Sequence, residues 1–218
     1  DAAEAARRAD AASPVVLVLP GSRRSEIRHL MPVFGEAVAR VAAMRPGARF
    51  VLPAVSHLHD EIAQAASGWA HRPEIVTGEA AKLTAFRSAR AALAASGTVT
   101  LELALAQVPT VAAYRGAGWE AAIARRLIKL PSVILPNLIL GRSVVPEFIQ
   151  EDATAQTLAD RLEAALAEGE DRHRQLAGFA EVEAPKREEQ QCDRAEASDE
   201  APRLLAMAFD AAPELDAD

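Results

Sequence analysis

A turn of small polar residues followed by a carboxylate is the part of this sequence best suited to chemistry. Ser96-Gly97-Thr98 follows a run of small apolar residues and precedes a predicted helix that carries Glu102. The first backbone N–H groups of a helix have no acceptor within the helix, and the helix dipole favours an anion at that end. The turn therefore predicts a phosphate site, because its hydroxyl groups can donate and its glycine adds no bulk.

Glu102 needs a separate explanation, since a carboxylate beside an anion site repels a phosphate. An acidic residue in this place suits a neighbouring diol, whose hydroxyl groups donate to it as a ribose does in dinucleotide-binding folds. Phosphate and ribose together indicate a nucleotide. A structural alternative stays open, with Ser96 as the N-cap of the helix and Glu102 as a solvated residue that interacts favourably with the helix dipole.

Two further segments carry side chains of types that bind phosphates. Gly21-Ser22-Arg23 follows a strongly apolar run, and Arg23 can present a planar set of donors to a diphosphate oxygen. Asn137 and Arg142 lie in a later loop, separated mainly by apolar residues. Ordinary roles are open for both segments, the first as a surface turn and Asn137 as a residue that bonds its own backbone. The sequence contains neither a Walker A loop nor a GxGxxG pattern.

Short apolar runs alternate with helical patterns around these segments. Such alternation predicts an α/β fold, a Rossmann-like doubly wound parallel sheet of about six strands with a helical C-terminal tail. Ligands of these sheets bind at the carboxyl ends of the strands, near the point where the strand order reverses. We therefore expect the turns at Gly21 and Ser96 at that edge. The expected strands are 15–19, 49–53, 74–76, 91–95, 109–113 and 132–135. We expect one helix with Pro32 near its first turn. The other expected helices are 58–66, 79–88, 118–129, 154–167, 171–189 and 195–209.

Composition bounds the class of protein. With 218 residues, 50% of them hydrophobic, and a mean hydropathy of +0.01, we expect a soluble globular protein with a substantial core. The single cysteine, Cys192, excludes an internal disulfide, and without clustered histidines it makes a zinc site improbable. No apolar run approaches the roughly 18 residues that would span a bilayer. The first residue is Asp and residues 1–13 lack a signal-peptide pattern, so we expect a piece of a longer protein.

The charge is divided unevenly along the chain. Residues 1–150 carry 17 Lys and Arg against 12 Asp and Glu, whereas residues 151–218 carry 7 against 19. The basic part holds the motifs and suits an anionic ligand, while the acidic stretch fits a solvated helical face. Nucleic acid binding has little support, because only 4% of the residues are aromatic and no basic run occurs. No carboxylate cluster suited to a metal and no cofactor is predicted.

Four motifs, in this order, resemble those of the bacterial lipid-A-disaccharide synthase family. They are Leu-Pro-Gly-Ser-Arg at 19–23, Ala-Ser-Gly-Thr-x-Thr-Leu-Glu at 95–102, Leu-Pro-Asn-Leu-x-x-Gly-Arg at 135–142, and Ile-Gln-Glu-Asp-Ala-Thr at 149–154. The resemblance covers about residues 14–167. It implies the C-terminal, sugar-nucleotide-binding half of a GT-B glycosyltransferase. The implied organisation is a linker or helix remnant at 1–13, a UDP-sugar-binding domain at 14–167 and a helical tail at 168–218.

The resemblance also implies a reaction and a location. Such enzymes transfer the sugar of UDP-2,3-diacylglucosamine to 2,3-diacylglucosamine 1-phosphate with inversion and release UDP, and they are peripheral on the cytoplasmic face of the inner membrane. The missing N-terminal GT-B domain would supply acceptor contacts and the general base, so this chain alone would be inactive. Ser143 stands where the family usually has Glu.

Ten residues are implied to bind the donor. Glu102 would bind the ribose hydroxyl groups, and the other nine form three groups. These are Ser96, Gly97 and Thr98 around the diphosphate at the helix N-terminus, Gly21, Ser22 and Arg23 contacting it from the first loop, and Asn137, Arg142 and Gln150 lining the cleft toward the donor sugar or phosphates.

Three alternatives stay open. A UDP-sugar 2-epimerase shares the layout but would need catalytic carboxylates and a histidine in the cleft. A non-catalytic nucleotide-binding module is the second. The third concerns the helix expected at 118–129, whose apolar stripe of Trp119, Ile123, Leu127 and Leu130 fits either the core or a membrane surface.

Overall fold

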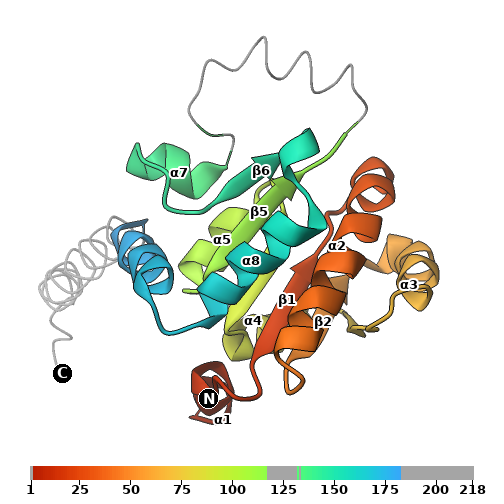
Figure 1. The fold of residues 1–218 in the computed structure, drawn as a ribbon, viewed down its shortest axis with the longest axis horizontal. Coiled ribbons are helices and arrows are strands. Elements are labelled where there is room, and N and C mark those ends of the chain that lie inside the picture. Colours follow the sequence, from red (N-terminus) through yellow and green to blue (C-terminus); the bar gives the residue numbers. More distant parts are fainter. Residues whose placement is uncertain (1, 117–131, 133, 183–218) are drawn as a thin grey trace, which may run out of the picture. The chain divides into compact units, whose positions relative to one another are not determined.

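A computed structural model describes residues 2–116, 132 and 134–182 of the chain (Figure 1). All described residues belong to one compact unit, which ends at Val182. This unit is built on a six-stranded sheet in the order β3-β2-β1-β4-β5-β6. Every pair of neighbouring strands is parallel, which confirms the predicted doubly wound α/β fold.

The bounds of the elements are as follows. The strands are β1 Val15–Leu19, β2 Arg49–Ala54, β3 Glu74–Thr77, β4 Ala91–Ala95, β5 Thr110–Tyr114 and β6 Glu147–Ile149. The helices are α1 Ala2–Ala9, α2 Arg24–Met44, α3 His59–Ser67, α4 Glu79–Ser88, α5 Val99–Leu105, α7 Leu135–Leu140 and α8 Ala155–Leu166, with 3₁₀ turns at Ser56–Leu58 and Gln150–Asp152 and a helical stretch at 170–182.

The strand order reverses between β1 and β4. From β1 the chain moves outward through β2 and β3, returns to place β4 beside β1, and continues outward through β5 and β6. Both central strands are fully buried, which explains why they read as continuous apolar runs rather than alternating ones. Leu19 pairs with Ala94 in the parallel register, so the carboxyl ends of the two strands lie side by side.

Helices cover both faces of the sheet. On one face α2, α3 and α8 pack against the strands through side chains that include Phe34 and Leu162, both fully buried. Figure 1 shows α2 and α8 crossing this near face. On the other face α4 and α5 bury Phe86 and Leu103 against β1, β2 and β4. Because each of these helices packs on the strands through its apolar side chains, one end of the helix lies near the carboxyl edge of the sheet.

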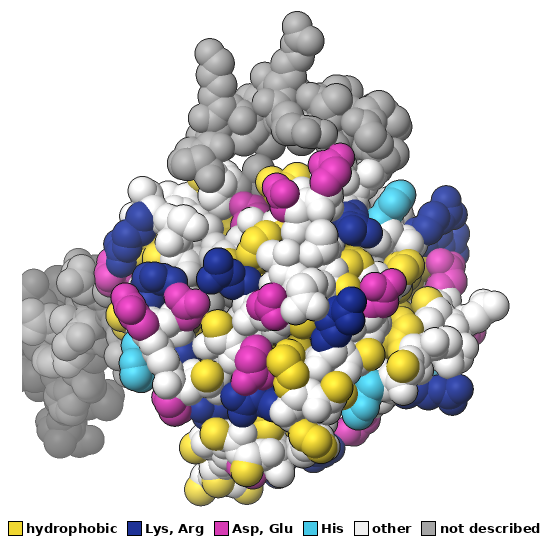
Figure 2. All heavy atoms as spheres, in the orientation of Figure 1, with side chains coloured by type: hydrophobic (Ala, Val, Ile, Leu, Met, Phe, Trp, Pro, Cys, Tyr) yellow, Lys and Arg dark blue, Asp and Glu magenta, His cyan; other side chains and the backbone are white. Residues whose placement is uncertain are grey.

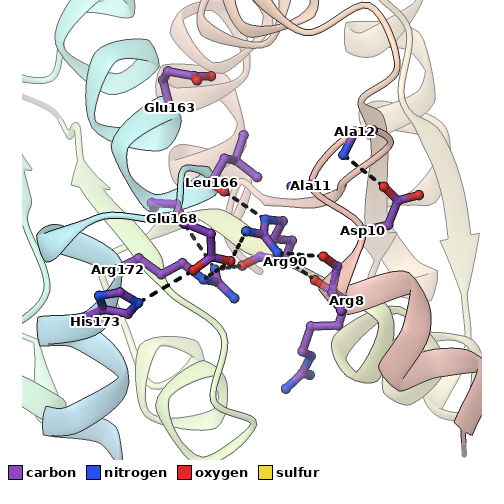
Figure 3. Close-up of polar contacts among 12 residues, drawn as sticks. Arg8, Asp10, Ala11, Ala12, Arg90, Glu163, Leu166, Glu168, Arg172 and His173 are labelled. Atoms are coloured by element: carbon purple, nitrogen blue, oxygen red, sulfur yellow. Dashed lines mark hydrogen bonds and ion pairs between the residues drawn. The ribbon is translucent and has the colours of Figure 1, made fainter.

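A buried arginine ties the amino end of β4 to distant parts of the chain. Arg90 is 1% exposed, and its guanidinium donates to the carbonyl oxygen of Leu166 at 2.8 Å and to those of Arg8 and Ala9 at 3.2 Å each. It also forms an ion pair with Glu168 (Figure 3). One side chain therefore joins the end of α1 and the end of α8 to the sheet.

The sixth strand is not where the sequence predicts it. Residues 132–135 were expected to form it, but Leu135 begins helix α7 and the strand lies at Glu147–Ile149. A short apolar run without clear periodicity fits a strand or a buried helix equally well. Pro136 decides for the helix, because proline favours the first helical turn, and Gly141 ends it in the left-handed conformation at φ +62°.

Helix α2 begins earlier than expected. Pro32 was predicted near its first turn, whereas the helix begins at Arg24 and places Pro32 in its interior. The ring is exposed there, so the missing N–H costs one helical hydrogen bond without a clash in the core. The other expected strands and the helices at 58–66, 79–88 and 154–167 are confirmed to within one residue at each end. The helices expected at 118–129 and 195–209, and the expected continuation beyond 182, lie outside the described residues.

No helix within 2–116 and 134–182 is long and apolar enough to cross a bilayer. On the face shown in Figure 2, basic and acidic side chains alternate without a large area of one sign. Ion pairs in the described part of the chain include Arg45–Glu163 at 2.5 Å and Arg24–Glu61 at 2.8 Å.

Candidate functional site

The two turns expected to bind phosphate meet at the carboxyl edge of the sheet. The turn beginning at Gly21 follows β1, the turn beginning at Ser96 follows β4, and these strands are neighbours at the reversal of strand order. Strands on either side of this point lead their connections to opposite faces, which leaves a crevice where ligands of doubly wound sheets bind. The structure therefore brings together two segments that lie more than seventy residues apart.

The N-cap of α5 is Thr98, so the structural alternative in which Ser96 caps the helix does not hold. The N–H of Ser96 donates to the carbonyl oxygen of Ala113 at 2.8 Å and so extends the β4–β5 ladder by one residue. This bond keeps Ser96 extended, and the helix begins two residues after Gly97, at Val99.

Donors remain available in this turn. The first helical hydrogen bond runs from the N–H of Thr100 to the carbonyl oxygen of Gly97 at 3.1 Å. The N–H groups of Gly97, Thr98 and Val99 precede it and have no acceptor among the residues that the structure describes. The hydroxyl of Ser96 is buried and likewise has no partner in the described part of the chain. Four polar groups of one turn are thus free to bind a ligand with acceptor oxygens.

The loop after β1 is organised differently, because a carboxylate of α2 already occupies it. Glu26 accepts from the N–H groups of Ser22 at 2.9 Å and Arg23 at 3.2 Å, and its second oxygen accepts from the Arg23 guanidinium at 3.1 Å. Gly21 has φ +107°, and a Cβ at this position would lie 2.2 Å from the Glu26 carboxylate. What the loop presents outward is the Arg23 side chain, which is 79% exposed.

Glu102 lies on the first turns of α5 and is held by a residue that the sequence reasoning missed. The Nζ atom of Lys82, on α4, lies 2.6 Å from one carboxylate oxygen of Glu102. Lys82 also lies over the ring of Phe86, 5.5 Å from its centroid. The Glu102 side chain is 48% exposed, so solvent or a ligand can reach the carboxylate.

Asn137 has a structural position in α7. It is 3% exposed, its amide nitrogen donates to the carbonyl oxygen of Val145 and to the hydroxyl of Ser132, and its amide oxygen accepts from the N–H groups of Val144 and Val145. These four bonds use the full hydrogen-bonding capacity of the amide. In this structure Asn137 fixes the loop that leads into β6.

Arg142 and Gln150 each have a partner within the chain. Arg142 donates to Glu181 at 2.6 Å. This pairing raises the pKa of Arg142 and lowers that of Glu181, chiefly through the hydrogen bond between them. Gln150 follows β6 at the carboxyl edge with φ +54°, and its amide bonds both backbone polar groups of Gly116 at 3.3 Å. It links the ends of β5 and β6.

Two residues that complete the candidate site were not predicted. Glu26 lies three residues after the N-cap Arg23, which is the spacing at which an acidic residue bonds back to the start of a helix, so the sequence did carry a signal for it. No sequence signal indicated Lys82, because it lies on a different helix from Glu102. Among the described residues no group of three or more potential metal ligands is found.

The arrangement can bind a diphosphate together with a diol. The open turn offers N–H and hydroxyl donors, Arg23 offers an exposed cation from the turn after β1, and Glu102 offers an acceptor one turn into α5.

Comparisons with known proteins show which family the chain resembles. A family model described as lipid-A-disaccharide synthetase matches residues 1–201. Curated lipid-A-disaccharide synthases from Rhodopseudomonas palustris are 52% identical over 83% of this chain and 46% of their own length (strain HaA2) and 55% identical over 81% and 45% (strain BisB18). The chain therefore spans about half the length of the curated relatives that it matches.

Among solved structures, a protein from Listeria monocytogenes assigned as a UDP-N-acetylglucosamine 2-epimerase is similar, with a TM-score of 0.51 and 15% identity over 75% of this chain and 39% of that one. At this level of identity the similarity shows the fold alone.

Proposed function

The chain belongs to the lipid-A-disaccharide synthetase family, and on that premise we propose that it forms the donor-nucleotide half of a GT-B glycosyltransferase. The proposed reaction moves the sugar of UDP-2,3-diacylglucosamine onto 2,3-diacylglucosamine 1-phosphate and releases UDP. Support comes from the high identity to synthases over four fifths of the chain.

The observation that carries the proposal is the meeting of the Gly21 and Ser96 turns at the switch point of the sheet. In the proposed complex the diphosphate lies on the free N–H groups and the hydroxyl of the Ser96 turn. Arg23 reaches it from the turn after β1, and Glu102 accepts from the ribose hydroxyl groups. The N–H groups of Ser22 and Arg23 stay with Glu26, so the first loop acts through side chains and not through its backbone.

The proposed chemistry is an inverting displacement. The 6-hydroxyl oxygen of the acceptor attacks the anomeric carbon while the bond from that carbon to the UDP oxygen breaks. Negative charge then develops on the departing diphosphate, where preorganised N–H dipoles and the Arg23 guanidinium stabilise it. The attacking hydroxyl must lose its proton to a general base. We assign that base to a preceding domain, so this chain alone would bind donor but not transfer the sugar.

The remaining predicted residues take more indirect parts in this proposal. Asn137 would shape the loop near the donor sugar, since its amide is fully engaged within the fold. Gln150, at the end of β6, and Arg142 would line the sugar side of the crevice. A ligand that bonds either of them has to replace the contact with Gly116 or Glu181.

The acyl chains of both proposed substrates favour a peripheral location on the cytoplasmic face of the inner membrane. The amphipathic pattern at 118–130 is the part of the sequence that suits such contact, and it lies outside the described residues. Binding to anionic vesicles would test this part of the proposal.

Titration calorimetry with UDP tests the site. We expect the chain to bind UDP, and we expect Arg23→Ala and Glu102→Gln each to weaken binding about tenfold, since each removes a charged hydrogen-bonding partner of the ligand. Arg24→Ala is the matched control, because Arg24 is the next residue, is similarly exposed, and pairs with Glu61 instead. Undiminished affinity in both site variants would contradict the assignment.

Activity assays of a protein that includes the preceding half separate the reaction from its alternatives. Formation of disaccharide 1-phosphate supports the transferase. Epimerisation of UDP-N-acetylglucosamine in the same protein would favour a UDP-sugar 2-epimerase, and UDP binding without either activity would favour a non-catalytic module.

A further inference from the structure

The Glu102 carboxylate needs a fixed orientation to recognise a diol. Its side chain is 48% exposed on the surface of α5, where a glutamate ordinarily samples several rotamers. Two hydroxyl groups of a ribose can both donate to a carboxylate only if that carboxylate is held in one place. Whatever restrains Glu102 therefore contributes to recognition of the sugar.

Lys82 provides that restraint. It lies in the first turn of α4, where its N–H donates to the carbonyl oxygen of Gly78 at 3.0 Å, directly after β3. The starts of α4 and α5 thus meet at the carboxyl edge of the sheet. The Nζ atom lies 2.6 Å from the Oε2 atom of Glu102, and the Lys82 side chain is only 29% exposed.

The position of Lys82 is itself fixed by an aromatic ring. Its ammonium lies 5.5 Å from the centroid of the Phe86 ring, one turn further along α4. Phe86 is 5% exposed and packs in the core beneath α4 and α5. The cation is therefore held between a buried ring and a carboxylate, an arrangement that restricts both long side chains.

Charge is the second consequence of this pair. An unpaired Glu102 would place a full negative charge one turn from the donors of the Ser96 turn and would repel a diphosphate. Pairing with Lys82 neutralises that charge. The ammonium bonds Oε2, and the Oε1 atom has no partner among the described residues, so acceptor capacity remains for hydroxyl groups.

We propose that Lys82 is a positioning residue that holds the Glu102 carboxylate for the ribose diol of the nucleotide. This inference rests on the proposed function, since it requires UDP to bind at the β1–β4 edge. It adds a residue on α4 that sets the preference for ribose over deoxyribose without itself contacting the sugar.

The test compares the affinities of UDP and 2′-deoxy-UDP for the chain and its variants by calorimetry. We expect the unmodified chain to favour UDP by about tenfold, because the deoxy analogue leaves a carboxylate acceptor unsatisfied. Lys82→Met keeps the apolar contact with Phe86 but removes the ammonium, and it should reduce the preference to that of Glu102→Gln. Lys82→Arg, which keeps the charge, should restore part of it.

Arg49→Met is the control for loss of an ion pair. Arg49 pairs with Glu74 at 2.9 Å at the start of β2, and both side chains are exposed. We expect this variant to retain the full preference for UDP. Thermal unfolding of each variant checks that it is folded before its affinity is compared.

The outcomes separate this inference from the proposed function. If Glu102→Gln abolishes the preference and Lys82→Met retains it, the inference is overturned while the nucleotide site stands. An equal loss of UDP and deoxy-UDP affinity in Lys82→Met also overturns it, because Lys82 would then act as a general positive charge. If the unmodified chain binds no UDP, or Glu102→Gln leaves the preference unchanged, the proposed function fails and the inference fails with it.

Discussion

The two turns of the candidate site use their polar groups in opposite ways. In the turn after β1, the N–H groups of Ser22 and Arg23 are satisfied by the carboxylate of Glu26. In the turn after β4, three N–H groups and the hydroxyl of Ser96 have no acceptor in the described part of the chain. The first turn is therefore organised in advance by its own helix, and the second is left to be completed by a ligand.

Replacing Glu26 by Ala should lower the free energy of unfolding by about 1 kcal/mol, because two backbone donors at the start of α2 lose their acceptor. Denaturant unfolding measures the change. Glu36→Ala, at an exposed position further along the same helix, should change it by less than about 0.5 kcal/mol. Equal losses in the two variants would mean that Glu26 does not organise the loop.

At the scale of the elements, α8 completes the near face of the sheet. Leu158, Leu162 and Leu166 of this helix are fully buried against α2 and the strands. The 3₁₀ turn that contains Gln150 connects β6 to α8. The packing of α8 on the sheet therefore also fixes the end of β6. Its N-cap is Thr154, whose hydroxyl accepts from the N–H of Thr157 at 3.1 Å.

Thr154→Ala should destabilise the fold by about 1 kcal/mol through loss of this cap. Thr154→Ser is the matched control, because it keeps the hydroxyl and should recover most of the stability. Thermal or denaturant unfolding of both variants measures the difference. If the serine variant is as unstable as the alanine variant, the loss of stability comes from the missing methyl group and not from the cap.

At the scale of the whole compact unit, an arginine cluster lies on the amino side of the sheet (Figure 3). It joins the end of α1 to the end of α8. Arg90 and Arg172 are both buried, and Arg172 donates to the carbonyl oxygens of Arg90 and Ala165. Burial, followed by repulsion from Arg90, lowers the pKa of Arg172. Glu168 is the carboxylate that pairs with this cluster, and its hydrogen bond with Arg90 lowers its pKa.

This shift makes part of the stability depend on pH. Because the pKa of Glu168 is lower in the folded chain than in the unfolded one, its contribution is fully present above the unfolded pKa. The contribution is lost as the pH falls through the lowered folded pKa. The stability difference between the unmodified chain and Glu168→Gln should therefore be present at pH 7 and shrink between about pH 5 and pH 3.

Urea unfolding across this pH range measures the effect. Glu151→Gln is the control, since Glu151 is exposed and carries the same charge change outside the cluster. A difference for Glu168→Gln that stays constant down to pH 3 would contradict the ion-pair explanation.

The sequence by itself determined the fold class and the place of the two turns that we propose bind the diphosphate. A strand buried on both faces reads as a continuous apolar run, and the small polar residues and glycine after β1 and β4 mark the turns that follow them. These patterns are local. Residues 15–23 and 91–98 therefore predict a strand and the turn after it without reference to the rest of the chain. The run at 132–135 was misread because local apolarity does not distinguish a strand from a helix.

Tertiary structure decided which side chains act together. Lys82 meets Glu102, and Arg90 meets the carbonyl oxygen of Leu166, only after the crossovers have set α4 beside α5 and the end of α8 beside β4. Such contacts join elements that lie far apart in the sequence, and their geometry depends on how whole helices pack on the sheet. The sequence determined where the two turns lie along the chain, and packing determined which charged partners surround them.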